Sequence, residues 1–138
     1  MKKSIWAVLL AAIVCLFCVS CSKTTTNTSK LVGTWKIVKE TVTYNGASRS
    51  EPFSDNVTLQ FVKGGDFVVT KTHGDVTYSY AGSWFVVDDY VTATYSLGSR
   101  AVTRNSRIES VDSKSLILSY TELSGNTPYT YTHALVKQ

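Results

Sequence analysis

Few side chains in this 138-residue chain are of the types that act as nucleophiles, general bases or metal ligands. The two histidines, His73 and His133, have no partner that the spacing of the sequence would place beside either of them. Asp88-Asp89 is typical of a hairpin turn, because a calcium loop needs more oxygen ligands at set spacing. The sequence also lacks a Gly-rich phosphate loop, a His-x-x-x-His pair and a Gly-x-Ser-x-Gly motif. It therefore predicts that the protein is not an enzyme and holds no metal ion and no cofactor.

Three arginines form the one charged feature that could recognise a ligand. Arg100, Arg104 and Arg107 lie in a stretch, 96–108, that contains no acidic residue. A guanidinium can form paired hydrogen bonds with a carboxylate. Because side chains alternate between the two faces of a strand, Arg104 and Arg107 cannot both face inward. We therefore expect Arg100 or Arg104 to face a ligand; the alternative is that all three are solvated surface charges.

The three cysteines all lie in the first 21 residues, at Cys15, Cys18 and Cys21. This segment begins with two lysines, continues with an apolar run over residues 5–19 and ends in small residues, which is the pattern of a secretory signal peptide. The run of 15 residues is short for a membrane span. Cleavage after Ser20 would leave Cys21 at the N-terminus, and the folded part would then contain no free thiol and no disulfide.

The segment Cys18-Val19-Ser20-Cys21 resembles the lipobox of bacterial lipoproteins, although a lipobox usually begins with Leu where this chain has Cys18. The resemblance implies that residues 1–20 are a signal peptide and that the Cys21 sulfur carries lipid such as palmitate. The partner of that acyl chain would be the lipid bilayer, and the location would be the cell envelope. Surface-displayed lipoproteins often have acidic residues after the lipidated cysteine, whereas Ser22-Lys23 follow here. This difference favours an outer-membrane anchor that faces the periplasm.

Composition divides the rest of the chain into a tether and a domain. Residues 22–30 contain no apolar side chain, so residues 21–30 are expected to form the lipidated cysteine and a flexible tether. Residues 31–138 have the length of one domain with one core. Without Lys2 and Lys3 the net charge of +4 falls to +2, and this excess is spread along the chain. The charge pattern therefore predicts no nucleic-acid partner.

Apolar residues in this domain recur with a period of two, which is typical of β-strands. Val57, Leu59 and Phe61 show the alternation, and the domain is rich in Val, Thr and Tyr. Turn signals separate the runs at Asn45-Gly46, Gly64-Gly65-Asp66, His73-Gly74-Asp75, Asp88-Asp89, Asp112-Ser113-Lys114 and Ser124-Gly125-Asn126. The predicted strands are 33–44, 56–62, 67–72, 76–87, 90–96, 101–111, 115–121 and 128–137.

Eight consecutive strands joined by short turns favour an all-β fold, an eight-stranded antiparallel up-and-down barrel. Closure of a barrel removes the exposed edges that an open sheet would leave. The alternative is a β-sandwich, which usually needs long crossing connections. The only long loop in this pattern is 45–55, so the barrel is favoured.

Gly33-Thr34-Trp35, at the start of the first strand, resembles the Gly-x-Trp signature of lipocalins, in which the Trp closes one end of the barrel. With the lipoprotein-type signal, the tether and the final YTHALVKQ, the chain resembles the lipocalin-like domain of small bacterial lipoproteins over nearly all of 31–138. In lipocalins an Arg from the end of the barrel usually packs on this Trp, whereas the last strand here ends Leu135-Val136-Lys137, so Lys137 would have to substitute for it. A second Gly-x-Trp, Gly82-Ser83-Trp84, is expected to be structural and to mark a bend.

The apolar phase of each strand predicts which side chains face the barrel interior. The set includes five tyrosines, whose rings are apolar and whose hydroxyls seek a partner when buried. The alternatives are that these tyrosines fill a solid core or lie outside, and that the last strand turns Thr130, Thr132, Ala134 and Val136 inward. The inward set is Ile37, Val57, Leu59, Phe61, Val69, Tyr78, Tyr80, Trp84, Val86, Val91, Ala93, Tyr95, Leu116, Leu118, Tyr120, Tyr131, His133 and Leu135.

An eight-stranded barrel either fills its interior with side chains or holds one small ligand. We expect a membrane-anchored, lipocalin-like protein that binds a small, partly apolar molecule inside the barrel. The alternative is an accessory lipoprotein that contacts envelope proteins or glycans through its outer surface and the loop 45–55. The candidate ligand-binding residues are Tyr78, Tyr80, Tyr95, Tyr120, Tyr131, His133, Arg100 and Arg104.

Overall fold

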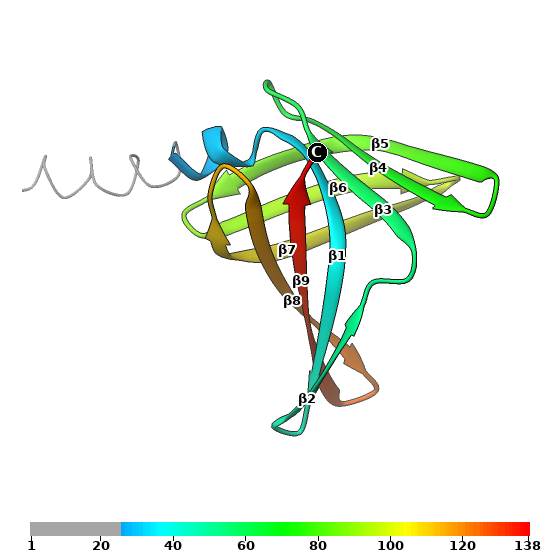
Figure 1. Cartoon of the computed structure of the whole chain (residues 1–138), viewed down its shortest axis with the longest axis vertical. Coiled ribbons are helices and arrows are strands. Elements are labelled where there is room, and N and C mark those ends of the chain that lie inside the picture. The colour runs from blue at the N-terminus through cyan, green and yellow to red at the C-terminus, as the bar shows by residue number, and fades with distance from the viewer. Residues whose placement is uncertain (1–25) are drawn as a thin grey trace, which may run out of the picture.

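The computed structural model describes residues 26–138, which form a short helix and nine antiparallel strands (Figure 1). The strand order is β2-β1-β3-β4-β5-β6-β7-β8-β9, and β1 also pairs with β9. Eight strands therefore close into a barrel and β2 is an extra strand, which confirms the predicted barrel and excludes the sandwich. The strands are β1 (Gly33–Tyr44), β2 (Ala47–Pro52), β3 (Asn56–Phe61), β4 (Asp66–His73), β5 (Val76–Val87), β6 (Tyr90–Leu97), β7 (Arg100–Val111), β8 (Ser115–Ser124) and β9 (Thr127–Lys137).

Strand β2 lies where the sequence predicts only a loop, 45–55. Asn45 and Gly46 have φ of 49° and 77°, so they form the tight turn that joins two antiparallel strands. β2 then pairs with residues 39–44 of β1, while β3 pairs with residues 33–36. All six residues of β2 are exposed, and its sequence ASRSEP shows no apolar phase. The prediction was wrong here because a strand that buries neither face leaves no alternation to detect.

A β-bulge in β1 changes which side chains face the interior. The pairing of β1 with β9 shifts register between Ile37 and Lys39. Ile37 is buried before the bulge, and Glu40 lines the interior after it, although the two residues differ in parity. A bulge adds one residue to one strand and so reverses the alternation beyond it. The bulge therefore places a carboxylate among inward-facing side chains.

The closed end of the barrel is built around Trp35. Trp35 and Leu31 are fully buried, and the Trp35 indole Nε1 donates a hydrogen bond of 2.8 Å to the Leu31 carbonyl. Leu31 ends the helix 26–31, so the part of the expected tether that the structure describes is helical and packs against the barrel. Cys21 and the signal-peptide prediction lie outside the described residues. Between residues 26 and 138, no helix is long and apolar enough to cross a membrane.

Lys137 covers Trp35 from the last strand. Its Nζ lies 5.0 Å from the centre of the Trp35 ring and donates a hydrogen bond of 3.0 Å to the Val32 carbonyl. Gly33 makes room for this contact, since a Cβ there would lie 2.6 Å from Lys137 Cε, and its φ of 138° also favours glycine. Lys137 therefore takes the position in which the lipocalin resemblance implies a cation.

Gly82 allows two neighbouring strands to approach closely. A Cβ on Gly82 of β5 would lie 1.7 Å from the carbonyl oxygen of Thr94 in β6. Two residues later, Trp84 is buried, and its indole Nε1 donates a hydrogen bond of 2.9 Å to the Val62 carbonyl. Both residues of this second Gly-x-Trp therefore have structural roles near the closed end.

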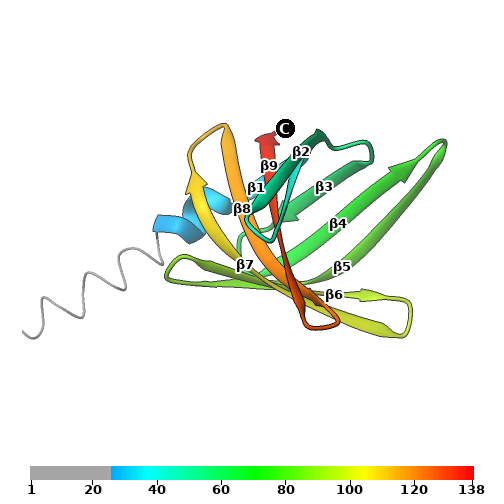
Figure 2. The same cartoon turned by 90° about the horizontal axis from the view of Figure 1, so that it is seen from below.

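The mouth of the barrel lies at the other end of the molecule. Figures 1 and 2 show the helix at one end and the tips of the β1–β2 and β4–β5 hairpins far from it. Pairs of hydroxyl side chains link the strands of these hairpins, as between Thr41 and Ser50 and between Thr72 and Thr77. Such cross-strand pairs stabilise ribbons that extend beyond the core. Among the described residues, the barrel and its helix share one hydrophobic core.

Replacing Trp35 by Ala should destabilise the domain by about 3–5 kcal/mol, because a buried indole and its hydrogen bond are lost. Urea unfolding followed by circular dichroism measures the change. The matched control is Phe85→Ala, since Phe85 is 58% exposed on the outer face and its loss should cost no more than about 0.5 kcal/mol. Equal losses in the two variants would contradict a closing role for Trp35.

Candidate binding site

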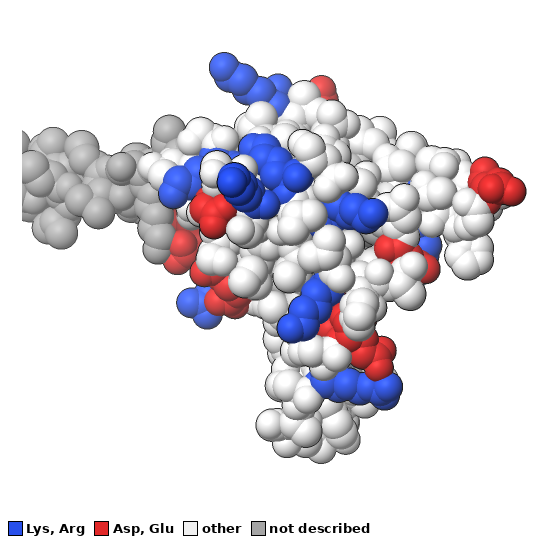
Figure 3. Space-filling model, viewed as in Figure 1, with Lys and Arg blue, Asp and Glu red and all other residues white. Residues whose placement is uncertain are grey.

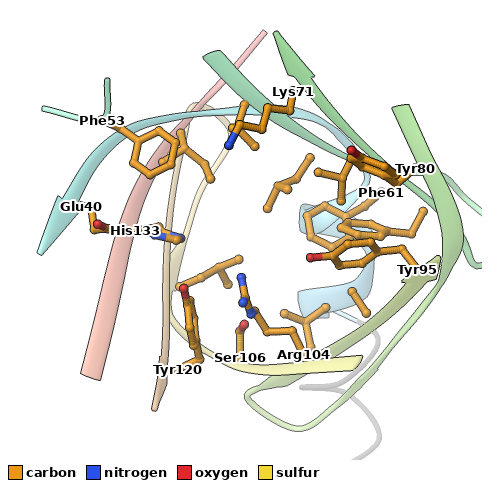
Figure 4. A pocket seen from close by; sticks show the side chains of 18 of the residues that line it. Glu40, Phe53, Phe61, Lys71, Tyr80, Tyr95, Arg104, Ser106, Tyr120 and His133 are labelled. Carbon is orange, nitrogen blue, oxygen red and sulfur yellow. Dashed lines mark hydrogen bonds and ion pairs between the residues drawn. The ribbon is translucent and has the colours of Figure 1, made fainter. Parts of the chain in front are cut away.

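A cavity of about 430 Å³ lies inside the barrel (Figure 4). Its lining is mainly apolar, and β3, β4 and β6 supply many of the apolar side chains. This apolar part of the cavity could hold a hydrocarbon or an aromatic ring by burial of apolar surface. These apolar lining residues are Val57, Leu59, Phe61, Phe67, Val91 and Ala93.

The upper wall of the cavity is polar. Glu40 of β1, Lys71 of β4, Arg104 and Ser106 of β7 and His133 of β9 line it from different sides (Figure 4). Each of these residues shares a strand face with apolar core residues nearer the closed end. The interior therefore changes from apolar to charged along the barrel axis, as an amphipathic ligand would require.

The predicted tyrosines fall into two groups. Tyr80, Tyr95 and Tyr120 line the cavity. Tyr131 is not part of the lining, and its ring stacks on that of Tyr120 at 5.2 Å between centroids. Tyr78 has the same parity as Tyr80 but is half exposed, because β5 extends past the rim of the barrel. The structure therefore does not bring Tyr78 into the cavity.

The three arginines separate as strand alternation requires. Arg104 lines the cavity, whereas Arg107 lies outside and pairs with Glu109 at 3.9 Å. Arg100 has the same parity as Arg104 but lies at the exposed first position of β7, outside the cavity lining. Arg100 and Arg104 were the two candidates to face a ligand. The structure places Arg104 in the cavity wall and leaves Arg100 beyond the rim.

His133 is the most enclosed titratable side chain of the upper wall. Its Nε2 lies 2.7 Å from Glu40 Oε2, and this nitrogen donates because a carboxylate only accepts. Phe53 and Tyr120 each meet the imidazole edge-on at 5.6 Å between centroids. His133 and Leu135 are buried on the same face of β9, so the last strand turns the predicted phase inward and not the alternative one.

Arg104 is fixed by an aromatic ring and an acid. Its guanidinium carbon lies 4.1 Å from the centre of the Tyr120 ring, and its Nη2 donates a hydrogen bond of 3.0 Å to Glu122 Oε1. Burial raises the pKa of Tyr120 to about 12, and the positive charge of Arg104 opposes that rise. The Tyr120 hydroxyl is therefore protonated at neutral pH and remains a hydrogen-bond donor.

Lys71 holds a comparable place on the opposite wall. Its Nζ lies 2.8 Å from Asp55 Oδ2, in the segment that follows β2. The hydrogen bond between them lowers the pKa of Asp55 and raises the pKa of Lys71. This ion pair links the segment between β2 and β3 to the wall of the cavity.

Six lining residues were not predicted from the sequence: Glu40, Phe53, Phe67, Lys71, Leu97 and Ser106. Lys71 shares the parity of Val69, which was predicted to face inward, so its position could have been found by extending that phase. Glu40 could not be found in this way because the bulge reverses the parity of β1. Phe53 lies outside any strand and has no periodic signal. Among the described residues, no group of three or more His, Cys, Asp or Glu side chains could hold a metal ion.

No protein-family model matches the chain, and no curated protein sequence matches it. Several solved structures resemble its fold. A lipocalin-like protein from Bacteroides uniformis superposes with a TM-score of 0.59 at 17% identity, over 79% of this chain and 99% of that one. An uncharacterized protein from Bacteroides eggerthii gives a TM-score of 0.54 at 14% identity, over 78% of this chain and 99% of the other.

Apocrustacyanin C2 is a third structure of this shape. It gives a TM-score of 0.55 at 12% identity, over 85% of this chain and 66% of its own. At these identities the likeness concerns the fold alone. The closed eight-stranded antiparallel barrel with one extra strand is a lipocalin-like fold.

Proposed function

We propose that the protein binds a small, partly apolar molecule inside the barrel and acts as a binding protein, not as an enzyme. The observation that carries the proposal is the cavity of about 430 Å³, a volume in the range of small-molecule sites. A barrel of eight strands can fill its interior completely. Here the side chains leave room between apolar lining residues and a polar upper wall.

The polar groups of the upper wall would orient such a ligand. The hydroxyls of Tyr80 and Tyr95 and the Ser106 side chain reach into the cavity (Figure 4). A few polar groups among apolar walls fix the position of a ligand, while the apolar area supplies most of the affinity. Glu40 and His133 are paired with each other, so they shape the wall and need no ligand group for their own satisfaction.

We propose in addition that Cys21 anchors the protein to the outer membrane, on the side that faces the periplasm. The lipobox resemblance carries this step. The structure supports its geometry, because the helix 26–31 lies at the closed end, away from the hairpin tips that surround the mouth (Figures 1 and 2). A tether attached there leaves the mouth free for a ligand.

The cavity favours ligand binding over the alternative role of an accessory lipoprotein. A protein that works only through surface contacts with envelope proteins or glycans needs no space inside its barrel. The face of the molecule shown in Figure 3 carries Lys and Arg side chains interspersed with Asp and Glu. A nucleic-acid partner would favour a continuous basic surface, so we propose none.

The first test uses N-phenyl-1-naphthylamine, a neutral dye that fluoresces in apolar surroundings. The lipid-free chain 22–138 should bind it in the cavity. Replacing Val69 of the cavity lining by Trp should weaken binding by at least about tenfold, since 1.4 kcal/mol of lost contact is enough. The matched control is Val87→Trp on the outer face, which should bind as the parent does. No binding by the parent, or equal binding by both folded variants, would refute the proposal.

A second test concerns the protonation of Tyr120. Absorbance at 295 nm should show a component with a midpoint near pH 12 that is absent from Tyr120→Phe. Because the folded pKa is raised from 10.0, this burial contributes stability below pH 10 that is lost as the pH rises towards 12. Arg104→Met should move the midpoint upward, because a charge that favours the phenolate is removed. A midpoint near pH 10 would show that Tyr120 is solvated.

Metabolic labelling with radioactive palmitate tests the anchor. The parent chain should incorporate label and should sediment with membranes. Cys21→Ala should lose both properties, since its sulfur is the only expected site of acylation. Cys18→Leu restores the usual first residue of a lipobox and serves as the control that should label at least as well as the parent. Equal labelling of the parent and Cys21→Ala would rule out the anchor.

A further inference from the structure

We propose that the ligand is an amphipathic anion whose acidic group lies between Lys71 and Arg104. The inference rests on the proposed function and adds the chemical class of the ligand. Lys71 of β4 and Arg104 of β7 line the same cavity from different walls, and Figure 4 shows both cationic groups directed into it. A ligand whose apolar body packs over Phe61 and Phe67 would place its acidic head at the level of these two cationic groups.

The acids that now pair with these cations lie outside the cavity. Asp55 and Glu122 are absent from its lining. The side-chain exposures are 45% and 34% for the Lys71–Asp55 pair and 36% and 52% for the Arg104–Glu122 pair. Ion pairs exposed to this degree contribute little to stability, since water solvates both partners. A ligand anion can therefore take a share of each cation at small cost.

The same comparison disfavours a cationic ligand. Glu40 is the one acid among the described residues that line the cavity, and His133 already occupies it at 2.7 Å. The side chains of His133 and Glu40 are only 11% and 32% exposed. Separating this pair would leave the enclosed His133 ring without its hydrogen-bond partner, which is unfavourable. The cavity thus offers two exchangeable cations and no exchangeable carboxylate.

Arg104 is also oriented for an acidic group. Its guanidinium packs over the Tyr120 ring and donates to Glu122 from Nη2. A guanidinium has five N–H donors in one plane, so donors remain after the bond to Glu122. Ser106, two residues along the same face of β7, adds a hydroxyl that reaches into the cavity (Figure 4).

The experiment compares two dyes with the same aromatic body. 1-Anilinonaphthalene-8-sulfonate is N-phenyl-1-naphthylamine with one sulfonate added, so their difference reports on the anion. The double variant Lys71→Gln/Arg104→Gln should weaken binding of the sulfonate by about tenfold or more, as expected when charged hydrogen bonds are lost. Binding of the neutral dye should change less than about twofold. The control is Arg107→Gln on the outer face, which should bind both dyes as the parent does.

Removing the competing acids should act in the opposite direction. Asp55→Asn/Glu122→Gln frees both cations and should tighten binding of the sulfonate without affecting the neutral dye. A merely structural role for these ion pairs would instead weaken both dyes. In competition against the neutral dye, decanoate should also displace it at lower concentration than decyltrimethylammonium does.

The outcomes separate this inference from the proposed function. If the neutral dye binds but the sulfonate responds to neither double variant, or if the quaternary ammonium competes better than decanoate, the anionic class is wrong and ligand binding stands. If neither dye binds the folded parent chain, the proposed function itself fails. Thermal unfolding of each variant confirms that a lost signal reflects binding and not the loss of the fold.

Discussion

The pairing of β1 with three other strands is the constraint on which the rest of the structure depends. β9 follows β1 over most of its length, β3 pairs with its first residues, and β2 pairs with its last. Without the β1–β9 pairing the sheet would have two open edges. Because β1 changes partners from β3 to β2, the segment 53–55 must cross the side of the barrel near the mouth. As a result of this crossing, Phe53 lines the cavity and Asp55 pairs with Lys71.

The β-bulge in β1 links this closure to the chemistry of the site. Before the bulge the inward side chains are Trp35 and Ile37, which belong to the closed end. Beyond it the inward face begins with Glu40, which meets His133 of the neighbouring strand. One inserted residue therefore separates the sealed apolar end from the polar upper wall. An unbroken alternation would instead have turned Lys39 into the interior.

The sequence predicted the strands well because most hairpins carry their own turn residues and most strands bury only one face. Six of the eight connections between strands carry one of the turn signals identified in the sequence, and those after β2 and β6 do not. β2 itself buries neither face and was missed.

The candidate site was predicted less completely because its residues depend on register and strand length. Parity alone placed Tyr80, Tyr95, Arg104 and His133 correctly on the inner face. It could not show that β5 extends past the rim, which leaves Tyr78 outside, and it could not show the bulge that turns Glu40 inward. These features depend on how strands of unequal length pair when the barrel closes. The periodicity of a single strand does not reveal its register against a neighbouring strand.

The depth of each polar group in the barrel decides which contacts are permanent and which can exchange. At the closed end, the Trp35 indole donates to a backbone carbonyl in a fully buried setting, and that bond serves the fold. Half-way up, the Glu40–His133 pair is enclosed by aromatic rings and is costly to separate. At the rim, the ion pairs of Lys71 and Arg104 are open to water, where charges change partners easily. Specificity for a charged ligand group can therefore reside only at the rim, while the deeper groups hold the walls in place.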